Sequence, residues 1–366
     1  GSITHLRGDL VRLSHIDRMR AIAVLCMVQV HTAAIIPPRG MSVDDPAAFV
    51  AAAFGGMAAP MFVMISGWGI HKSAVRRVAE GRNGESAWIA WLIPRVALLA
   101  ICQILVNVLL NVERGGRFEW YTPGVLTLLA IAALISPILA KLGVKVRASL
   151  MLVVAASPVF LGDAAGLGGF WERVYSVGAY EWVARLLWNG TYPALPWLFF
   201  ILLGTLIYDL SENRNVRERF VAIGLALTTV TIGVAGAEGT PWALTEGDAI
   251  LTFFPASPAF LVVSGTLAVL AHRILEGDEG GGGKPWRGDG LSFLEPLGKI
   301  TLTVYVAHFA VLGVVASAMQ GEPELELVPA FAATIGHTLI WIPLAIMHQR
   351  HCPKLSLEEL LRRVSN

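Results

Sequence analysis

Charged residues are scarce in this sequence. Asp, Glu, Lys and Arg make up only 15% of its 366 residues, against about 25% in a typical soluble domain. Hydrophobic residues make up 55%, and the mean hydropathy is +0.62. This composition excludes an ordinary soluble globular domain and predicts a polytopic integral membrane protein surrounded by the lipid bilayer.

The sequence also has almost no excess charge of either sign. With 28 basic and 27 acidic residues the formal net charge is +1, and the basic residues are scattered over short loops instead of gathered in one patch. Binding to nucleic acid requires such a basic patch. No nucleic acid is therefore expected among the partners.

Cysteine is rare, and its three positions form no motif. Cys26 and Cys102 lie in apolar runs and Cys352 lies near the C-terminus, without a CxxC pair or a Cys/His cluster. The sequence therefore predicts neither a disulfide framework nor a metal site. The glycine run before Lys284 is followed by Pro285, where a phosphate-binding loop needs Ser or Thr. We expect this run to be a flexible cytoplasmic linker.

Long apolar runs, in contrast, are abundant. A transmembrane helix needs about 20 mainly apolar residues, and ten segments approach this length. The predicted fold class is all-α, a polytopic membrane helix bundle with about ten transmembrane helices. Residues 163–191 mix aromatic residues, glycines and charges, which favours an interfacial segment. The fifth and sixth helices, which flank this segment, therefore have the least clearly defined ends. The expected helices are 18–36, 47–70, 88–110, 121–140, 148–162, 192–208, 220–236, 249–271, 296–318 and 328–347.

The charges of the loops predict the orientation of the bundle. If the N-terminus is cytoplasmic, 21 of the 26 basic residues assigned to loops and tails face the cytoplasm. Basic residues favour the cytoplasmic side of a membrane, so both termini are expected there. The expected organisation is a cytoplasmic N-terminal segment (1–17), a single transmembrane domain (18–347) with a flexible cytoplasmic loop at 273–295, and a cytoplasmic C-terminal tail (348–366).

The first apolar run carries two ionisable side chains at a regular spacing. Arg20 and His31 are eleven residues apart, which in a helix separates them by about 16 Å along the axis and leaves them within about 20° of one face. An ionisable group inside a membrane is costly and often serves function. The structural alternative is that His31 is a hydrogen-bonding group of the core and Arg20 a topology anchor. Spacing alone leaves both interpretations open.

Two later runs carry further polar side chains. Tyr305 and His308 lie on one face of the ninth helix. Ser66 and Gly67 form either a packing notch or a ligand contact in the second helix. His337 stands alone on an apolar helix, which favours a structural role.

The segment SHIDRMRAIAVLCMVQVH resembles the first-helix signature of the transmembrane acyltransferase superfamily. This superfamily includes the acyltransferase-3 proteins, the YeiB-like proteins and the heparan-α-glucosaminide N-acetyltransferase catalytic domain. Its Arg-x10-His spacing falls on Arg20 and His31, and its preceding Asp falls on Asp17. Four later segments resemble blocks of the YeiB-like and heparan-type branches, so the resemblance covers nearly the whole chain. They are FGGMAAPMFVMISGWG, NGTYPALPWLFFILLGTLIYD, FPASPAFLV and LGKITLTVYVAHF.

The resemblance implies a membrane-embedded acyltransferase. Such an enzyme would move an acyl group, acetyl first of all, from cytoplasmic acyl-CoA to an amine or hydroxyl of an extracytoplasmic acceptor such as an aminosugar or glycan. His31 would be catalytic, either as a general base or as a nucleophile that forms an acyl-imidazole. The expected donor substrate is acetyl-CoA, and no metal ion is expected. The protein is expected to lie in a bacterial cytoplasmic membrane. The residues expected to bind the coenzyme A thioester are Arg20, Lys72, Arg76, Ser66, Tyr305 and His308.

Two other functions stay open at this stage. A proton-coupled small-molecule transporter would also carry intramembrane histidines, although it usually has internal repeats with paired broken helices, which the sequence lacks. A haem-binding electron carrier could use His31, His308 and His337 as axial ligands. The sequence specifies neither the acceptor nor whether the protein is a monomer or an oligomer.

We predict that a reporter fused to Asn366 faces the cytoplasm, because the basic residues of the loops favour that orientation. Alkaline phosphatase, which is active only outside the cytoplasm, should give no signal there. It should give a strong signal when fused after Glu246, in a loop expected outside. Phosphatase activity at Asn366 would show that a helix had been miscounted, with residues 163–191 the first segment to re-examine.

Overall fold

The structure is a computed structural model and describes residues 14–41, 45–166, 168–211, 213–241, 243–247, 249–276, 288–320 and 325–365. It confirms the all-α class, since long helices make up most of this part of the chain. The long helices are α2 (Ser14–Ile35), α3 (Pro46–Ala79), α4 (Glu85–Leu109), α5 (Val125–Leu139), α6 (Val144–Leu161), α9 (Ala194–Asp209), α10 (Arg214–Glu238), α11 (Pro258–Glu276), α13 (Thr301–Met319) and α14 (Leu327–His351).

Each predicted apolar run overlaps one of these helices. Among the described residues, eight helices are long and apolar enough to cross a membrane. α9 reaches that length together with Gly178–Asn189, from which it is bent by 44°. α5 has 15 residues, which gives about 22 Å, shorter than the roughly 30 Å of a hydrocarbon core. The fold is therefore a polytopic bundle with eight or nine full candidate spans, and α5 accounts for the remaining run.

The segment at 163–191, predicted to be interfacial, folds into short helical turns. They are η2 (Gly162–Ala165), α7 (Phe170–Val174), α8 (Gly178–Ala184) and η3 (Arg185–Asn189). Arg173 ties these turns together, because its guanidinium donates to five backbone carbonyl oxygens, those of Ala165, Gly166, Gly168, Asn189 and Gly190. Burial lowers the pKa of Arg173 to about 10, with a smaller contribution from Arg185. The guanidinium therefore stays cationic at neutral pH.

One predicted helix begins later than expected. The sequence predicts a helix over 249–271, whereas α11 begins at Pro258 and β2 (Leu251–Phe254) occupies the start of the run. This part of the prediction is wrong because Pro255 and Pro258 lack the N–H group of a helix interior and disfavour helical backbone at the residue before them. β2 instead pairs in parallel with β1 (Ala243–Glu246).

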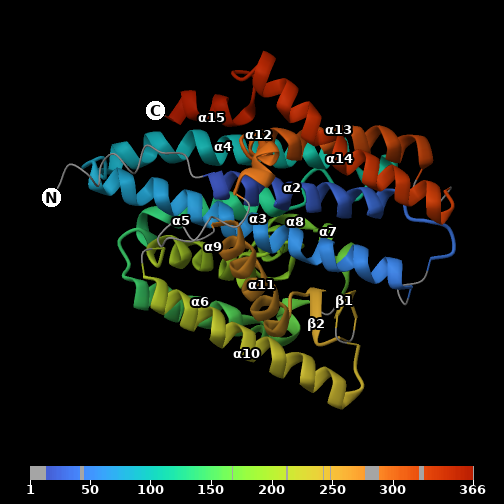
Figure 1. The fold of residues 1–366 in the computed structure, drawn as a ribbon, viewed down its shortest axis with the longest axis horizontal. Helices are drawn as coiled ribbons and strands as arrows, with labels where there is room; N and C mark the ends of the chain where they lie inside the picture. Colours follow the sequence, from blue (N-terminus) through green and yellow to red (C-terminus); the bar gives the residue numbers. More distant parts are fainter. Residues whose placement is uncertain are drawn as a thin grey trace.

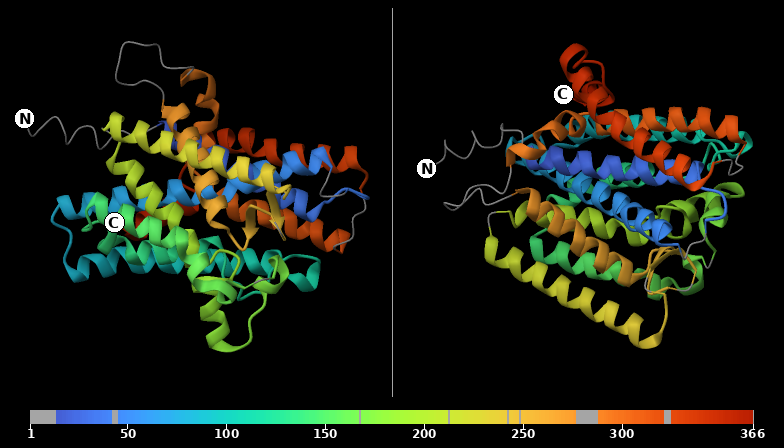
Figure 2. Two further views of the ribbon diagram at one scale, coloured as in Figure 1. Left: turned by 90° about the horizontal axis from the view of Figure 1, so that it is seen from below. Right: turned by 45° about the vertical axis from the view of Figure 1, so that its right-hand side comes forward.

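The helices α2, α3 and α9 form the centre of the bundle. α3 packs against both α2 and α9, and α2 also contacts α11, α13 and α14. α10 lies at one edge, where it packs on α11, and α14 and α15 (Leu357–Ser365) lie at the opposite edge (Figures 1 and 2). The large apolar side chains that α10 exposes, among them Ile223 and Val230, suit a lipid-facing position.

Two glycines let α3 and α9 approach each other closely. A β-carbon on Gly67 would lie 2.6 Å from the carbonyl oxygen of Ile201, and a β-carbon on Gly204 would collide with the carbonyl oxygen of Met64. Small residues at such contacts allow membrane helices to pack backbone to backbone. Gly67 thus serves as a packing notch, and its neighbour Ser66 is half-buried beside it.

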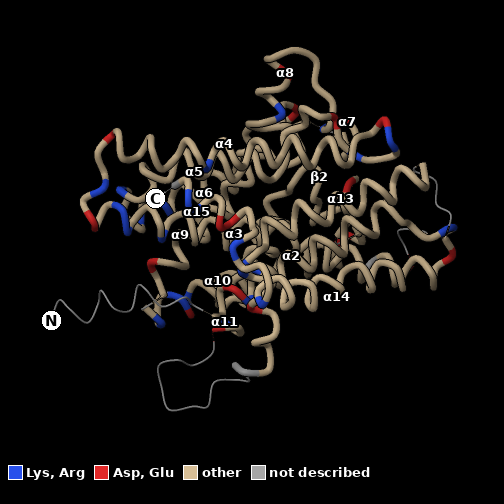
Figure 3. Tube along the Cα trace, turned by 90° about the horizontal axis from the view of Figure 1, so that it is seen from above, with Lys and Arg blue, Asp and Glu red and all other residues tan. Residues whose placement is uncertain are grey.

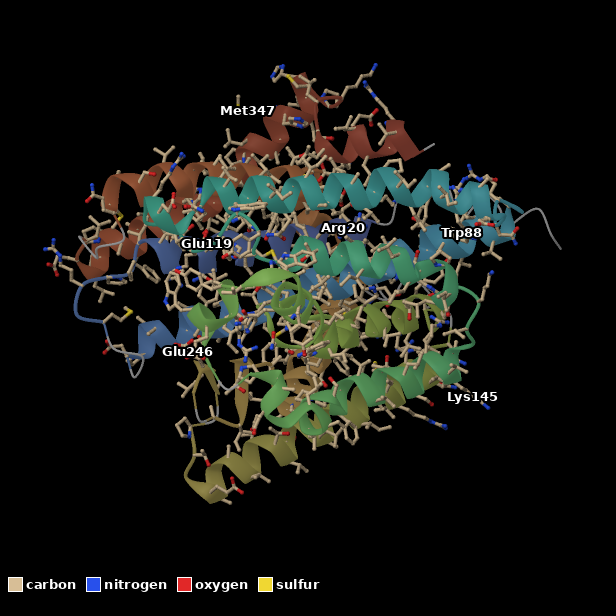
Figure 4. All side chains as sticks on the ribbon, turned by 180° about the vertical axis from the view of Figure 1, so that it is seen from behind. Arg20, Trp88, Glu119, Lys145, Glu246 and Met347 are labelled. Carbon is tan, nitrogen blue, oxygen red and sulfur yellow. The ribbon has the colours of Figure 1, made fainter. Side chains whose placement is uncertain are left out.

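The two ends of the bundle carry different loops. Lys and Arg positions gather at the end that holds the C-terminus, and long uncharged stretches run along the helices (Figure 3). Trp88 and Lys145, in the first turns of α4 and α6, lie toward one end, whereas Glu119 and Glu246, expected outside, lie toward the other (Figure 4). The loops expected in the cytoplasm thus lie at one end of the bundle and the loops expected outside lie at the other. Which end faces the cytoplasm stays a prediction.

Parts of the predicted domain organisation lie outside the described residues. These are residues 1–13 of the N-terminal segment and 277–287 of the predicted flexible loop, which include Lys284 and Pro285. The described flanks of that loop are helical, because α11 extends to Glu276 and is followed after the gap by η4 (Gly288–Leu294) and α12 (Glu295–Gly298).

Candidate functional site

Two histidines from different helices meet in the bundle core. His31 lies near the C-terminal end of α2, and His308 lies in the first half of α13. Nδ1 of His31 is 2.9 Å from Nε2 of His308. The ring planes are inclined by only 5°, with centroids 5.2 Å apart. The fold therefore joins into one pair two side chains that are 277 residues apart in sequence.

The hydrogen-bond partners assign the tautomers of the two neutral rings. Nδ1 of His308 is 3.1 Å from the carbonyl oxygen of Val304, and a carbonyl only accepts, so this Nδ1 carries the proton. Nε2 of His308 then has a lone pair and accepts a hydrogen bond from Nδ1–H of His31. This arrangement leaves the lone pair of His31 on Nε2, as a base or a nucleophile requires.

Aromatic rings surround the histidine pair. The ring of Phe309 lies 4.8 Å from that of His31 and 4.4 Å from that of His308, between centroids. Tyr305 lies 6.3 Å from His31 and 5.6 Å from His308. His308 is 0% exposed, whereas His31 keeps part of its surface accessible. The fold therefore brings together the predicted residues Tyr305, His308 and His31, with His31 as the accessible member.

The C-terminal helix fixes the start of α13. Glu358 of α15 accepts hydrogen bonds from the backbone N–H of Leu302 at 2.5 Å and of Thr303 at 3.2 Å, and from the Thr303 hydroxyl at 2.6 Å. A carboxylate at a helix N-terminus satisfies orphan N–H groups and is favoured by the helix dipole. Because His308 lies little more than one turn farther along, this cap helps to hold its ring in place.

His337 has the structural role that the sequence predicts for it. Its Nδ1 is 2.8 Å from the hydroxyl oxygen of Thr32, which donates to the carbonyl oxygen of Val28 at 2.5 Å. Thr32 directly follows His31 in α2. His337 thus anchors α14 to α2 beside the histidine pair.

The contact between His31 and His308 does not favour haem ligation by these rings. A metal ion held between two imidazole nitrogens needs about 2 Å to each of them, hence about 4 Å in all. The two facing nitrogens are 2.9 Å apart and share a hydrogen bond. Among the described residues, no group of three or more His, Cys, Asp or Glu side chains is arranged to hold a metal ion.

Arg20 lies on the inner part of α2, against α3. Its Nη1 is 3.6 Å from the buried carboxylate of Asp17, and a β-carbon on Gly69 would lie 2.9 Å from its Nη2. The glycine therefore makes room for the guanidinium, and 30% of the Arg20 side chain remains exposed. Arg20 lies nearer the middle of the long axis than Trp88 or Lys145, so it is recessed from the end of the bundle (Figure 4).

The other predicted donor-binding cations differ in their surroundings. Lys72 follows Gly69 by one turn of α3, and its ammonium lies 5.4 Å from the ring centroid of Trp68. Arg76, one turn farther, is 49% exposed and donates to Glu80 at 2.6 Å. Lys72 thus lies close to the contact between α2 and α3, whereas Arg76 forms a surface ion pair.

A buried polar network at the inner ends of α3, α6 and α9 is not evident from the sequence. Arg147 donates to Asp209, and its Nη1 is 3.1 Å from Nε2 of His71. His71 and Arg147 are each 2% exposed. Removal of one partner would leave an uncompensated buried charge, so the network holds the three helices together. The count of loop charges detects Arg147 but gives no sign of its partners.

Arg117 is likewise visible in the sequence only as one cation of an outer loop. Its Nη2 donates to the carbonyl oxygen of Ala34 at 2.7 Å, one turn beyond His31 in α2. Its guanidinium carbon lies 5.6 Å from the ring centroids of both Phe170 and Trp171. Three features therefore follow one another along α2. Arg20 lies in its first half, the pair of His31 with His308 of α13 lies in its second half, and Arg117 contacts its C-terminal end.

Comparison with known proteins identifies the family of the chain. The comparison with curated proteins gives no match. A family model described as an acyltransferase domain, that of the acyltransferase-3 proteins, matches residues 13–346 and so includes α2, α13 and the histidine pair. The match covers nearly the whole chain and confirms the resemblance found in the sequence. The chain therefore belongs to the acyltransferase-3 family of integral membrane acyltransferases.

Proposed function

We propose that the protein transfers an acyl group, acetyl first of all, from cytoplasmic acyl-CoA to an amine or hydroxyl of an extracytoplasmic acceptor. A membrane acyltransferase follows from the family, and the donor, the acceptor class and a location in a bacterial cytoplasmic membrane are proposals. The observation that carries the proposal is the hydrogen bond between His31 and His308, which leaves the lone pair of His31 on Nε2 in an apolar core.

In the proposed reaction His31 is the general base. Its Nε2 takes the proton from the acceptor while the acceptor oxygen or nitrogen attacks the thioester carbonyl carbon. The new C–O or C–N bond forms, the C–S bond breaks, and the thiolate of coenzyme A leaves with the proton that His31 received. His308 is a positioning residue, because it keeps His31 in the tautomer that accepts this proton.

The donor is proposed to bind along α2 from its inner end. Arg20 and Lys72 supply cations for the phosphates of coenzyme A, and a guanidinium suits phosphate oxygens particularly well. The eleven residues between Arg20 and His31 correspond to about 16 Å, comparable to an extended pantetheine arm. Ser66 and Tyr305 are proposed to contact this arm, and Arg76 adds to the positive potential at the entrance.

Replacing His31 with Asn should abolish acyl transfer and leave the affinity for coenzyme A intact. Asn keeps a polar group in the site but cannot take a proton, and general-base catalysis contributes about 10²–10⁴ in rate. Release of coenzyme A from labelled acetyl-CoA is measured with purified protein and a panel of aminosugars. Exposed His351 provides the matched control, His351→Asn. Near wild-type turnover of His31→Asn would contradict the role of His31 as a general base. If the wild-type protein retains the labelled acetyl group when no acceptor is present, His31 instead acts as a nucleophile through an acyl-imidazole.

Replacing His308 with Leu should lower kcat by about tenfold, because His31 loses the acceptor that fixes its tautomer. His308→Gln should restore part of the rate, since its amide oxygen can accept the same hydrogen bond. Steady-state kinetics and calorimetric affinity for coenzyme A are compared for both variants. A purely structural residue would instead lower thermal stability and donor affinity together, without rescue by Gln.

Replacing Arg20 with Ala should weaken the binding of coenzyme A by about tenfold or more. Hydrogen bonds from a charged donor to phosphate contribute about 1.5–3 kcal/mol each. Isothermal titration calorimetry of the detergent-solubilised protein measures the change. Lys145→Ala removes an exposed cation from the first turn of α6 and should leave the affinity unchanged. Equal affinities of wild type and Arg20→Ala would remove Arg20 from the donor site.

A further inference from the structure

A cavity of about 170 Å³ lies at the outer end of α2. We name it the outer cavity. Ala34, which lines it, follows His31 by one helical turn, about 4.5 Å along the axis. A group bound there would lie beside the residue that is proposed to activate the acceptor. The lining residues are Ala34, Ile35, Gly115, Gly116, Arg117 and Trp171.

The wall of the outer cavity is built on the same aromatic cluster as the histidine pair. The backbone N–H groups of Arg117 and Phe118 donate to the carbonyl oxygen of Leu110, at 2.8 and 3.1 Å. A β-carbon on Gly116 would collide with that oxygen, so only glycine allows the loop to close this tightly. The ring of Phe118 lies 6.2 Å from that of Phe309, which in turn packs on both histidines. The position of Arg117 is thus fixed relative to the histidine pair.

Arg117 is the one charged residue among those that line the outer cavity. One of its five N–H donors is used by Ala34, and the rings of Phe170 and Trp171 lie beside the guanidinium. Burial lowers the pKa of Arg117, and the charge of Glu246 opposes this shift. Glu246 itself accepts a hydrogen bond from the backbone N–H of Phe170 at 2.8 Å. A partly desolvated guanidinium with aromatic neighbours favours a carboxylate or a phosphate, which it can bind in a bidentate manner.

The volume of the outer cavity suits a small group. The cavity has about 170 Å³ and is partly open to the surface, so it has room for a single ring with a small substituent without enclosing it. Trp171 lines the cavity, is 48% exposed and provides an aromatic side chain for contact with such a ring. Size, charge and the aromatic wall therefore point to one ring that bears one acidic group.

We infer that the outer cavity is the acceptor site and that the acceptor is a single sugar-like ring with a carboxylate or phosphate that pairs with Arg117. This inference rests on the proposed function, because it takes His31 as the group that activates the acceptor. A soluble sugar and the headgroup of a lipid can supply the same acidic ring, and the experiment separates these two sources.

The test compares the binding of glucosamine 6-phosphate and glucosamine by calorimetry, on the solubilised protein with coenzyme A present. The wild type should bind the phosphorylated sugar at least about tenfold more tightly, through charge-assisted hydrogen bonds. Arg117→Ala and Arg117→Gln should both lose this preference, and Gln keeps a donor for the carbonyl of Ala34 in case the Ala variant folds poorly. Exposed Arg114 provides the matched control, because Arg114→Ala should retain the preference. Equal binding of the two sugars by the wild type, or a preference that survives both Arg117 variants, would overturn the inference.

Acyl transfer from acetyl-CoA to the same two sugars distinguishes failure of this inference from failure of the proposed function. Preference for the phosphorylated sugar without any transfer would refute the proposed reaction and leave the outer cavity as an anion site. Transfer that does not depend on Arg117 would support the reaction and overturn the outer cavity as the acceptor site. Binding is then repeated in nanodiscs of phosphatidylcholine with and without phosphatidylinositol, whose headgroup is a ring attached to a phosphate. Competition by phosphatidylinositol in the wild type but not in Arg117→Gln assigns the acidic group to a lipid headgroup, and binding that is unaffected assigns it to a soluble sugar.

Discussion

The hydrogen bond between His31 and His308 is the interaction on which the rest of the site depends. It joins α2 to α13 in a core where an unpaired polar group would be costly, and the carbonyl oxygen of Val304 sets its direction. A carboxylate in place of His308 would orient His31 as well, but it would bring a full charge into the membrane core. A neutral imidazole that donates to a backbone carbonyl provides the orientation without that cost. The cap that Glu358 places on α13 lies at the helix end, where a charge is tolerated.

The scaffold supports this pair by fixing the positions of α2 and its neighbours. Close packing of α3 on α9 at Gly67 and Gly204 holds α3 in place, and α3 in turn carries Gly69, against which Arg20 lies. The network of His71, Arg147 and Asp209 joins the inner ends of three helices. Because a helix has a fixed rise per residue, the separations along α2 between its inner cation, its imidazole and its outer end are fixed as well. In the proposed reaction a rigid α2 would let the donor and the acceptor approach Nε2 of His31 from opposite ends of the helix.

The positions of the helices could be predicted from the sequence because hydropathy is a local property. Apolar runs locate the ten long helices, although α3 continues to Ala79 beyond its predicted end at residue 70. The failure at 249–257 is also local, since Pro255 and Pro258 exclude a helix there. The contact between His31 and His308 could not be predicted, because helical periodicity shows only which side chains share a face of one helix. The same limit applies to Arg117, whose importance arises from the folding of a glycine-containing loop against α2. Pairing across helices is a tertiary property that one sequence does not encode in any short pattern.

The two cations along α2 differ in their surroundings. Arg20 lies 3.6 Å from the carboxylate of Asp17, and 30% of its side chain is exposed. Arg117 donates to a neutral carbonyl and lies beside aromatic rings. In the proposed reaction Arg20 would bind a phosphate of the donor, and Arg117 would bind an acidic group of the acceptor. The neutral histidine pair lies between these two cations, in an apolar part of the bundle. Under this proposal, charge recognition and proton transfer take place at separate positions, so no further charge has to be brought to the site of acyl transfer inside the membrane.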